Sequence, residues 1–341
     1  MKQFAMTIGI AAVLLFLSNV DVNTAVLALS LGLAAFNGAN DTSKGVATLA
    51  AAGVTSYRKA IIWGALATLA GSFLSVVVAS KMTALFSTGI LTTQPTTTYA
   101  LAVLAGSACW VAFATAMRLP VSTTHAIVGA LIGAAIFYAP QHIAWAALAH
   151  KVALPLFASI LLSYLISALL GKLYVKLPIG ANDHTNTAAK LMAKAHWLTS
   201  GAASFARGLN DTPKILALAG FGLAPTSGAV TWLVVAIALS MAIAGILAGL
   251  RVAKQLGENV VTMNHAEGFQ ANLTTAMLVA AGANLGLPMS TTHVATGAIA
   301  GVVAGNTARL NKRTLRDFAI AWTLTPLFAG AVAAAVYAFL T

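Results

Sequence analysis

Long uncharged apolar segments alternate along the chain with short segments that carry the ionisable residues. Residues 60–80 and residues 229–250 are two of these apolar segments. An α-helix of about 20 apolar residues can cross the roughly 30 Å hydrocarbon core of a bilayer. The pattern therefore predicts an all-α polytopic membrane protein. In the first half we expect spans at residues 6–19, 22–53, 56–80, 98–117, 123–138 and 152–175, and the second half repeats the series.

Two polar islands interrupt the apolar pattern, and each of them occurs twice. Residues 119–133 read LPVSTTHAIVGALIG and residues 287–301 read LPMSTTHVATGAIAG, with 9 of 15 positions identical. Residues 36–44, FNGANDTSK, and residues 206–214, ARGLNDTPK, share Gly, Asn, Asp, Thr and Lys in the same order. Nearly the same shift along the chain relates both pairs. Two independent pairs with a common shift indicate an internal duplication.

The duplication divides the chain into four expected parts. They are a first transmembrane span at residues 1–21, a first repeat at residues 22–176, a short cytoplasmic linker at residues 177–198 and a second repeat at residues 199–341.

Basic residues mark opposite ends of the two repeats. Arg58 and Lys59 follow the first Asn-Asp island, whereas residues 221–228, which follow the second, carry no charge. Because cytoplasmic loops are enriched in Lys and Arg, equivalent loops that differ in this way lie on opposite sides of the membrane. The repeats are therefore predicted to have inverted topology, as in many secondary transporters, with the N-terminus in the cytoplasm. Arg118 and Arg207 fit none of the predicted loops.

Composition agrees with a membrane protein and excludes other classes. Hydrophobic residues make up 59% of the 341 residues and charged residues 8%, against about 25% charged residues in a soluble domain. The net charge of +12 does not indicate nucleic acid, because the basic residues are spread over short loops. Cys109 is the single cysteine, so neither a disulfide framework nor a cysteine metal site is expected. Residues 1–20 resemble a signal peptide, but no small-x-small cleavage site follows them, so that we favour an uncleaved first span over a cleaved signal peptide. We locate the protein in the cell (inner) membrane.

The first Asn-Asp island lies in a segment, residues 22–53, that is too long for one straight crossing of the bilayer. We expect the helix to break at Gly38, and we expect Asp41 to cap the half-helix that follows. Asp211 is expected to cap the corresponding half-helix of the second repeat. An ionisable residue at membrane depth is costly and is functional by default. The alternative is that both aspartates are caps at the membrane surface beside solvated lysines.

Lys44 and Lys214 fall in the first turns of the predicted half-helices. This is the unfavourable end for a cation, because the helix dipole is positive there. Asp41 and Asp211, which precede the lysines by one helical turn, offset the charge in part, and a bound anion would offset it further. Both lysines are therefore candidate substrate-binding residues.

Each Ser-Thr-Thr island follows a proline, Pro120 or Pro288, which favours a fresh helix start. Ser122 and Ser290 are good N-cap residues for the helices that follow. Free backbone N–H groups and hydroxyls converge at such a start, where a tetrahedral oxyanion is a natural ligand. The candidate anion site has six hydroxyl residues, three from each repeat: Ser122, Thr123, Thr124, Ser290, Thr291 and Thr292.

A plainer interpretation is that these hydroxyls only cap a transmembrane hairpin. His125 and His293 follow the caps within one helical turn, so that they either face the site or support the loop. Glycines recur at every fourth position in the same helices and predict close helix packing: Gly129 and Gly133 in the first repeat, Gly297 and Gly301 in the second.

The quoted motifs together resemble the duplicated signatures of the PiT family of inorganic phosphate transporters, in both halves and in order. The resemblance implies a secondary active transporter of inverted repeats, with broken helices and re-entrant hairpins, that imports phosphate with sodium or protons. It also implies dimers, and an anion site lined by the six hydroxyl residues. The resemblance assigns the coupling cation, including sodium, to Asn40, Asp41, Asn210 and Asp211, and we add Asn37 to that set.

The chain departs from many members of this family at Lys44, where they have Asn. A tethered ammonium occupies space that a sodium ion would use, which favours a proton as the coupling ion. The family also includes sulfate permeases, so that sulfate or another tetrahedral oxyanion is the alternative substrate.

Two further classes stay open. A passive anion channel fits a pore lined by hydroxyls but does not explain the pair of aspartates. An intramembrane hydrolase would use Ser122, His125 and Asp41, but catalysis needs one asymmetric triad rather than two equal half-sites. We therefore expect a transporter with no enzyme activity and no cofactor, whose partners are phosphate, the coupling cation and the lipid bilayer.

Overall fold

A computed structural model describes residues 15, 18–174, 187–223, 227–261 and 263–341, and the structural statements below concern these residues. The predicted first span at residues 6–19 lies almost wholly outside them, as do residues 177–186 of the predicted linker. Residues 187–198 of that linker form the first turns of a long helix.

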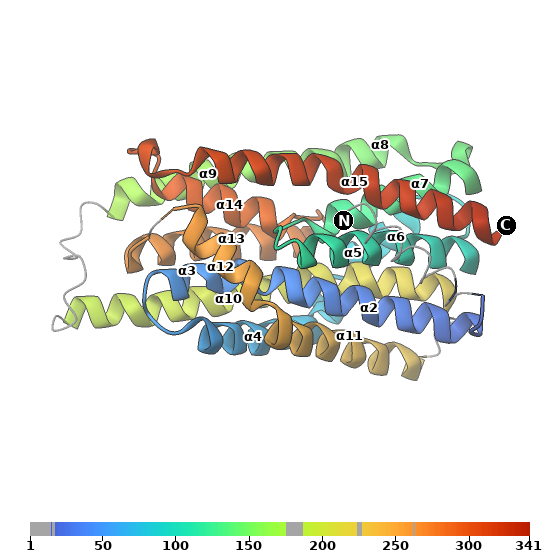
Figure 1. Ribbon diagram of the computed structural model, residues 1–341, viewed down its shortest axis with the longest axis horizontal. Coiled ribbons are helices and arrows are strands. Elements are labelled where there is room, and N and C mark those ends of the chain that lie inside the picture. Colours follow the sequence, from blue (N-terminus) through green and yellow to red (C-terminus); the bar gives the residue numbers. More distant parts are fainter. Residues whose placement is uncertain (1–14, 16–17, 175–186, 224–226, 262) are drawn as a thin grey trace.

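Helices make up the regular structure of the described residues. In chain order the elements are α2 (Val22–Asp41), α3 (Ser43–Ala51), α4 (Tyr57–Val78), α5 (Ser80–Ala84), the π-helix η1 (Leu85–Gly89), α6 (Thr97–Ala116), α7 (Thr123–Tyr138), the 3₁₀ turn η2 (Pro140–His142), α8 (Trp145–Ala147), the π-helix η3 (Leu148–Ala153), α9 (Leu154–Tyr174), α10 (Thr187–Gly222), α11 (Ser227–Ala248), α12 (Leu250–Asn259), α13 (His265–Leu285), α14 (Thr291–Val302), the 3₁₀ turn η4 (Thr307–Arg309) and α15 (Lys312–Leu340). The long helices lie side by side along the long axis of the molecule (Figure 1).

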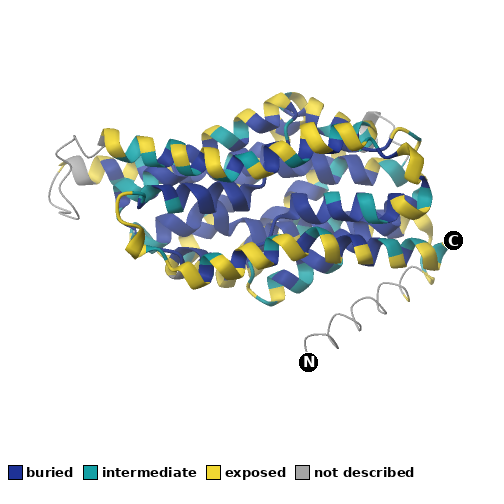
Figure 2. Cartoon of the chain, turned by 90° about the horizontal axis from the view of Figure 1, so that it is seen from above, coloured by how far each residue is buried: buried dark blue, intermediate teal, exposed yellow. Residues whose placement is uncertain are grey.

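The predicted polytopic membrane fold is confirmed. Six helical stretches of the described residues are long and apolar enough to span a bilayer: Val22–Ala51, Tyr57–Val78, Thr97–Ala116, Trp145–Leu173, Val230–Ala248 and Lys312–Leu340. Exposed residues lie mainly on the outward faces of the outer helices, and the interior is buried (Figure 2). Many of the exposed side chains are large and apolar, as a lipid-facing surface requires, whereas the interior holds buried polar and charged side chains.

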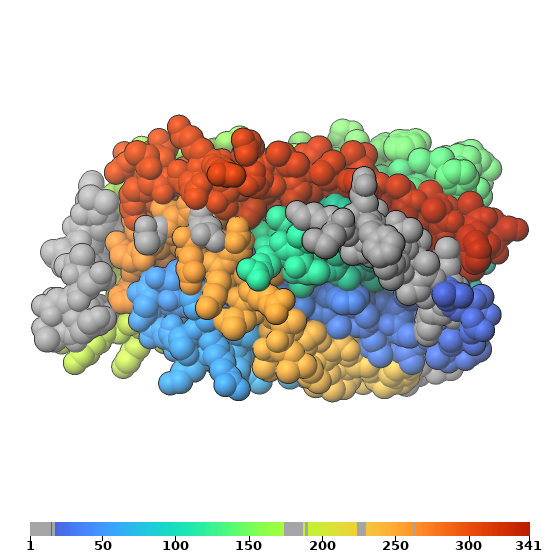
Figure 3. Space-filling view, viewed as in Figure 1, coloured from blue at the N-terminus to red at the C-terminus, as the bar shows by residue number. Residues whose placement is uncertain are grey.

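Helices of each repeat pack on helices of the other repeat. Helix α2 of the first repeat packs on α11 of the second, and α10, the equivalent of α2, packs on α4. In the same way α7 packs on α15, and α14 packs on α9. Colours from distant parts of the sequence consequently alternate on the face shown in Figure 3. Each repeat thus completes the other, as the predicted inverted repeat requires.

The glycines at every fourth position make the predicted close contacts. A Cβ atom on Gly133 would clash with the carbonyl oxygen of Gly330 on α15. A Cβ atom on Gly301 would clash in the same way with the carbonyl oxygen of Tyr164 on α9. The same backbone approach therefore holds α7 to α15 and α14 to α9.

The predicted helix break at Gly38 is wrong. Helix α2 runs through this residue to Asp41, and Thr42 keeps helical dihedrals (φ −57°, ψ −31°) before α3 begins. Gly38 instead permits close packing, since a Cβ there would clash with the carbonyl oxygen of Met241 on α11. The predicted capping roles of Asp41 and Asp211 are also wrong: Asp41 is the last residue of α2, the N-cap position of α3 is Thr42 without a side-chain cap, and Asp211 lies inside α10.

The chain breaks instead where the two re-entrant hairpins turn. Helix α6 ends before Arg118, at φ 60°, and α13 ends before Gly286, at φ 74°, so that both helices end on a left-handed residue at equivalent positions of the two repeats. Glycine is the usual residue at such an end. Arg118, which fitted no predicted loop, therefore lies at a hairpin tip, where its backbone conformation costs roughly 1 kcal/mol.

We predict that Gly133→Ala and Gly301→Ala each lower the free energy of unfolding by about 1–3 kcal/mol, because the added methyl group meets backbone atoms. Gly32→Ala is the matched control, since nothing lies within 4 Å of a Cβ at Gly32. Thermal unfolding of the purified protein in detergent measures the effect. Equal melting temperatures for all three variants would contradict the packing described here.

Candidate functional site

The two Ser-Thr-Thr islands begin the helices that they were predicted to begin. The Ser122 hydroxyl accepts a hydrogen bond from the His125 backbone N–H at 3.2 Å, and thereby caps α7. The Ser290 hydroxyl accepts the equivalent bond from His293, also at 3.2 Å, and caps α14. All six predicted hydroxyl residues are buried.

The tips of the two hairpins are bonded to each other. The Thr124 hydroxyl donates to the Met289 carbonyl at 3.3 Å, and the Thr292 hydroxyl donates to the Val121 carbonyl at 2.6 Å. Each tip therefore supplies a hydroxyl to the residue that precedes the other island. Segments from opposite halves of the sequence are thereby held together.

The predicted ion-coupling asparagines bind these tips. Asn40 accepts a hydrogen bond from the Val121 N–H at 3.1 Å and donates to the Leu119 carbonyl at 2.9 Å. Asn210 accepts from the Met289 N–H at 3.3 Å and donates to the Met289 carbonyl at 2.9 Å. Each asparagine thus fixes the hairpin of its own repeat by a pair of backbone hydrogen bonds.

One amide group bridges the two carboxylates. The Asn37 amide nitrogen lies 3.2 Å from Asp41 Oδ2, 3.1 Å from Asp211 Oδ2 and 3.0 Å from Thr123 Oγ1. The aspartates of the two repeats are therefore neighbours on either side of a single side chain. The structure brings them together with Thr123 of the candidate anion site.

Both predicted lysines reach into the same cluster. The Lys44 ammonium lies 2.5 Å from Asp41 Oδ1 and donates to the Val121 carbonyl at 2.7 Å. The Lys214 ammonium donates to Thr124 Oγ1 at 2.6 Å and lies 3.3 Å from Asp211 Oδ1. Each lysine thus joins its own aspartate to a hairpin tip.

Arg207 is a member of the cluster that the sequence analysis missed. This side chain is 1% exposed, and it donates to Asn37 Oδ1 at 3.1 Å and to Thr68 Oγ1 at 2.8 Å. When the two Asn-Asp islands are aligned, Arg207 is the counterpart of Asn37, so that the two equivalent positions bond to each other. The sequence offered one indication of this role: Arg207 is a cation that fits none of the predicted loops.

The charges of the cluster do not cancel. Three cationic side chains (Lys44, Lys214 and Arg207) and two anionic ones (Asp41 and Asp211) are buried together, which leaves a net charge of +1 when all are ionised. Because uncompensated charge is costly at low dielectric, an anion bound here would be stabilised.

The two histidines lie behind the tips and against each other. The ring centroids of His125 and His293 are 4.5 Å apart, and His125 Nδ1 lies 2.8 Å from Ser122 Oγ. The His293 ring lies 4.2 Å from the Trp322 ring, whose nitrogen donates to the Pro120 carbonyl at 3.1 Å. These contacts agree with support of the tips, and a direct role as ligands stays a prediction.

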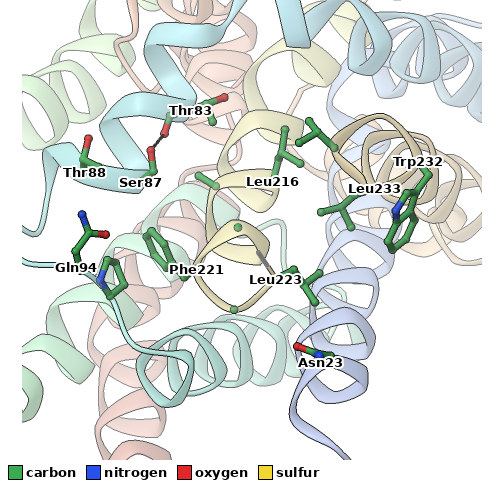
Figure 4. Close-up of a pocket in the computed structure, with 15 residues that line it drawn as sticks. Asn23, Thr83, Ser87, Thr88, Gln94, Leu216, Phe221, Leu223, Trp232 and Leu233 are labelled. Atoms are coloured by element: carbon green, nitrogen blue, oxygen red, sulfur yellow. Dashed lines mark hydrogen bonds between the residues drawn. The ribbon is translucent and has the colours of Figure 1, made fainter. Parts of the chain in front are cut away.

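A cavity of about 710 Å³ opens at the end of the molecule where α2 begins. Figure 4 shows hydroxyl and amide side chains of η1 and its neighbourhood, such as Ser87 and Gln94, on one side of it. Apolar side chains of α10 and α11, including Leu216 and Trp232, line the other side. Leu216 lies just beyond Lys214 on the same helix, so that α10 runs from the charged cluster to this cavity.

These features define a helical membrane protein of two inverted repeats with a buried charged centre. The chain belongs to the Phosphate transporter family (PHO4), whose sequence profile matches residues 37–333. The predicted family resemblance is thereby confirmed.

Curated relatives carry phosphate transport in their names. The "Probable low-affinity inorganic phosphate transporter" of Mycobacterium bovis is 28% identical over 311 residues, which cover 88% of this chain and 73% of that protein. The protein of the same name from Bacillus subtilis is 27% identical over 88% of this chain and 92% of its own length. The "Putative phosphate permease" of Pyrococcus abyssi is 24% identical over 92% of this chain and 96% of its own.

A solved structure shares the fold. "The sodium-dependent phosphate transporter" superposes on 94% of this chain and 99% of its own, with a TM-score of 0.84 and 22% sequence identity. The likeness confirms the predicted architecture.

We predict that Arg207→Gln lowers the melting temperature of the protein. We also predict that it raises, at least tenfold, the phosphate concentration that gives half of the maximal thermal stabilisation. The substitution leaves Asn37 and Thr68 without their buried partner and removes the excess positive charge. Arg251→Gln, at an exposed cation, is the control. Melting curves recorded over a phosphate titration measure both effects, and identical titrations for the two variants would exclude Arg207 from the site.

Proposed function

We propose that the protein is a secondary active transporter that imports inorganic phosphate together with a cation by alternating access. The observation that carries this proposal is the meeting of two capped hairpin tips with a buried cluster of net charge +1. The names of the relatives support phosphate as the substrate. The predicted homodimer is part of this proposal.

Phosphate fits the cluster better than the alternative substrate, sulfate. Both anions accept hydrogen bonds from hydroxyls and from helix N-termini. Only phosphate also carries a proton near neutral pH, and it can donate that proton to a carboxylate. The Asp41 carboxylate lies 3.5 Å from Thr123 Oγ1, so that an acceptor is within reach of an anion at the hydroxyls. A site that offers an acceptor discriminates against a ligand that cannot donate.

The cation most compatible with the cluster is a proton. A sodium ion at the predicted residues needs free oxygen ligands. Here Asp41 Oδ1 faces the Lys44 ammonium, and the amide oxygens of Asn40 and Asn210 accept hydrogen bonds from the hairpin backbone. These contacts favour a proton over a sodium ion at the predicted residues.

Protonation of the aspartates offers a direct route to coupling. A proton on Asp41 or Asp211 neutralises the carboxylate and weakens its ion pair with the neighbouring lysine. The released ammonium then binds the anion, which the charged carboxylates would otherwise repel. Substrate and proton thus bind together: with the phosphate dianion, the loaded cluster is neutral, whereas the cluster with the dianion alone carries −1 and the cluster with the proton alone carries +2.

Alternating access requires the hairpin tips to separate. In this conformation the bonds of Thr124 to Met289 and of Thr292 to Val121 close the passage between them. The cavity in Figure 4 provides the approach from the end where α2 begins, which we take as the outer end from the positive-inside rule. When the site opens toward the cytoplasmic end, each repeat takes the conformation that the other repeat had in the outward-open state.

The hydrogen-bond partners of Asp41 disfavour the alternative function, an intramembrane hydrolase with a triad of Ser122, His125 and Asp41. Ser122 and His125 lie within hydrogen-bonding distance, but the Asp41 carboxylate bonds Asn37 and Lys44 instead of the imidazole. A relay from carboxylate to imidazole to hydroxyl is therefore not assembled.

We predict that Asp41→Asn or Asp211→Asn abolishes accumulation of phosphate against its gradient and leaves exchange of phosphate for phosphate measurable. Asparagine keeps the shape of the side chain but cannot carry the coupled proton. Radiolabelled uptake and counterflow in proteoliposomes distinguish the two activities. Asp317→Asn, at an exposed aspartate, is the control, and unchanged accumulation in both site variants would rule out this coupling scheme.

We predict that wild-type uptake follows the proton gradient and does not change when external sodium is replaced by potassium. Lys44→Ala exposes Asp41 Oδ1 and is expected to make uptake dependent on sodium, whereas Lys59→Ala at an exposed lysine is not. Excess sulfate is the specificity control and should leave phosphate uptake intact. Strong sodium dependence of the wild type would refute proton coupling but not phosphate transport.

A further inference from the structure

A second cavity, of about 870 Å³, lies at the opposite end of the molecule from the cavity in Figure 4. Helix α9, the start of α13, the end of α14 and η4 surround it. Its polar lining is unlike that of the first cavity because it includes three charged side chains, Lys172, Glu267 and Arg309. Three amide side chains complete the polar lining: Asn264, Gln270 and Asn306. This end also carries the basic start of α15, and the positive-inside rule assigns it to the cytoplasm.

The internal duplication provides a comparison for this cavity. At the equivalent place, Tyr99 and Tyr138 of the first repeat form a cluster with Tyr337 of α15, with ring centroids 5.2 Å apart for Tyr99 and Tyr138 and 5.9 Å apart for Tyr138 and Tyr337. When the two Ser-Thr-Thr islands are aligned without gaps, Glu267 is the counterpart of Tyr99, and Asn306 is the counterpart of Tyr138.

The third tyrosine has a counterpart without a side chain. Gly133 packs on Gly330 of α15, and its equivalent Gly301 packs on Tyr164 of α9. Gly330 and Tyr164 are therefore equivalent positions of α15 and α9. Two turns further along the partner helices stand Tyr337 and Gly171, at equal distances in sequence from these contacts. Tyr99, Tyr138 and Tyr337 at one end of the molecule therefore correspond to Glu267, Asn306 and Gly171 at the other end, where the charged cavity lies.

The charges of the cavity favour an anionic ligand. Glu267 accepts two hydrogen bonds from Arg309, at 2.6 and 3.0 Å, and one from the Asn264 backbone at 2.9 Å. The hydrogen bond to Glu267 raises the pKa of Arg309 and keeps the guanidinium charged. With the exposed Lys172 ammonium, the lining carries a net charge of +1.

An apolar groove continues from this cavity toward the middle of the membrane. It has a volume of about 460 Å³ and shares Tyr164 with the charged cavity. Its walls are formed by α9, α14 and α15, through side chains such as Phe157, Leu161 and Trp322. Leu161 and Leu165 of α9 are 60% and 51% exposed, as expected of a helix that faces lipid.

We propose that the charged cavity and the apolar groove together bind one anionic glycerophospholipid of the cytoplasmic leaflet. Its headgroup phosphate contacts Lys172 and the amide side chains, and one acyl chain lies in the groove beside Trp322. Basic pockets between transmembrane helices on this side of a membrane are suited to anionic headgroups. Free phosphate shares the headgroup chemistry but has no apolar chain that could fill the adjoining groove.

The position of the groove connects the lipid to the hairpin tips. Trp322 contacts the His293 ring behind one tip and donates to the Pro120 carbonyl at the other. An acyl chain against Trp322 therefore packs on the support of both tips. Lipid binding itself is independent of the proposed transport activity, whereas an effect of the lipid on uptake rests on it.

The test is native mass spectrometry of the full chain in detergent, titrated with phosphatidylglycerol or phosphatidylcholine. We expect phosphatidylglycerol to bind preferentially and Lys172→Gln to weaken it about fivefold, the effect of one cation near a membrane surface. Lys151→Gln, which removes an equally exposed charge elsewhere, is the control and should bind as the wild type does. Gly171→Tyr with Asn306→Tyr places aromatic rings at the counterparts of Tyr337 and Tyr138 and should prevent binding.

Each outcome bears on the proposal. Melting curves without lipid confirm that the variants are folded, and Lys172→Gln, a surface substitution, is informative even if the double variant is not. Equal affinities of Lys172→Gln and Lys151→Gln would overturn the proposal. Displacement of phosphatidylglycerol by millimolar inorganic phosphate would do so as well and would identify a site for free phosphate. A photoreactive residue at Leu161 should crosslink to lipid, and a crosslink to a second copy of the chain would overturn the proposal by showing that a dimer covers the groove.

Discussion

The structure depends on the mutual compensation of five ionisable side chains inside the part of the molecule that lies in the membrane. A single buried charge costs several kcal/mol, and the loss of one partner exposes the other to that cost. Asn37 joins the two carboxylates, Arg207 holds Asn37, and each lysine joins its aspartate to a hairpin tip. The helices of both repeats must therefore be in place before the cluster is satisfied. The same cluster retains one excess positive charge, so that the constraint on folding also favours an anion.

The duplication gives both repeats the same helix caps and helix contacts, whereas substitutions at equivalent positions give the two repeats different charges and cavities. Both repeats use the same capping serine, the same tip asparagine and the same glycine contacts. At equivalent positions, however, Asn37 faces Arg207, and Tyr99 corresponds to Glu267. The first difference gives the centre its net charge. The second leaves a cavity open at one end of the molecule and fills the corresponding place at the other, so that a symmetric fold has two unlike ends.

Features that depend on local pattern could be predicted from the sequence. The apolar spans, the duplication, the helix starts at Ser122 and Ser290 and the close glycine contacts follow from residue type and spacing. The continuity of α2 could not be predicted, because the packing of Gly38 on Met241 is a contact between repeats. Membership of Arg207 in the site and the open cavity likewise depend on side chains that are distant in sequence and that only the packed structure brings together.

We propose that the two hairpin tips and the charged cluster between them hold the transported anion. A cryo-electron microscopy map of the protein with saturating phosphate would show where the anion binds. We expect tetrahedral density within hydrogen-bonding distance of hydroxyls from both residues 122–124 and residues 290–292, next to the lysine ammonium groups. Density bound to one tip alone, or located away from both tips, would contradict it.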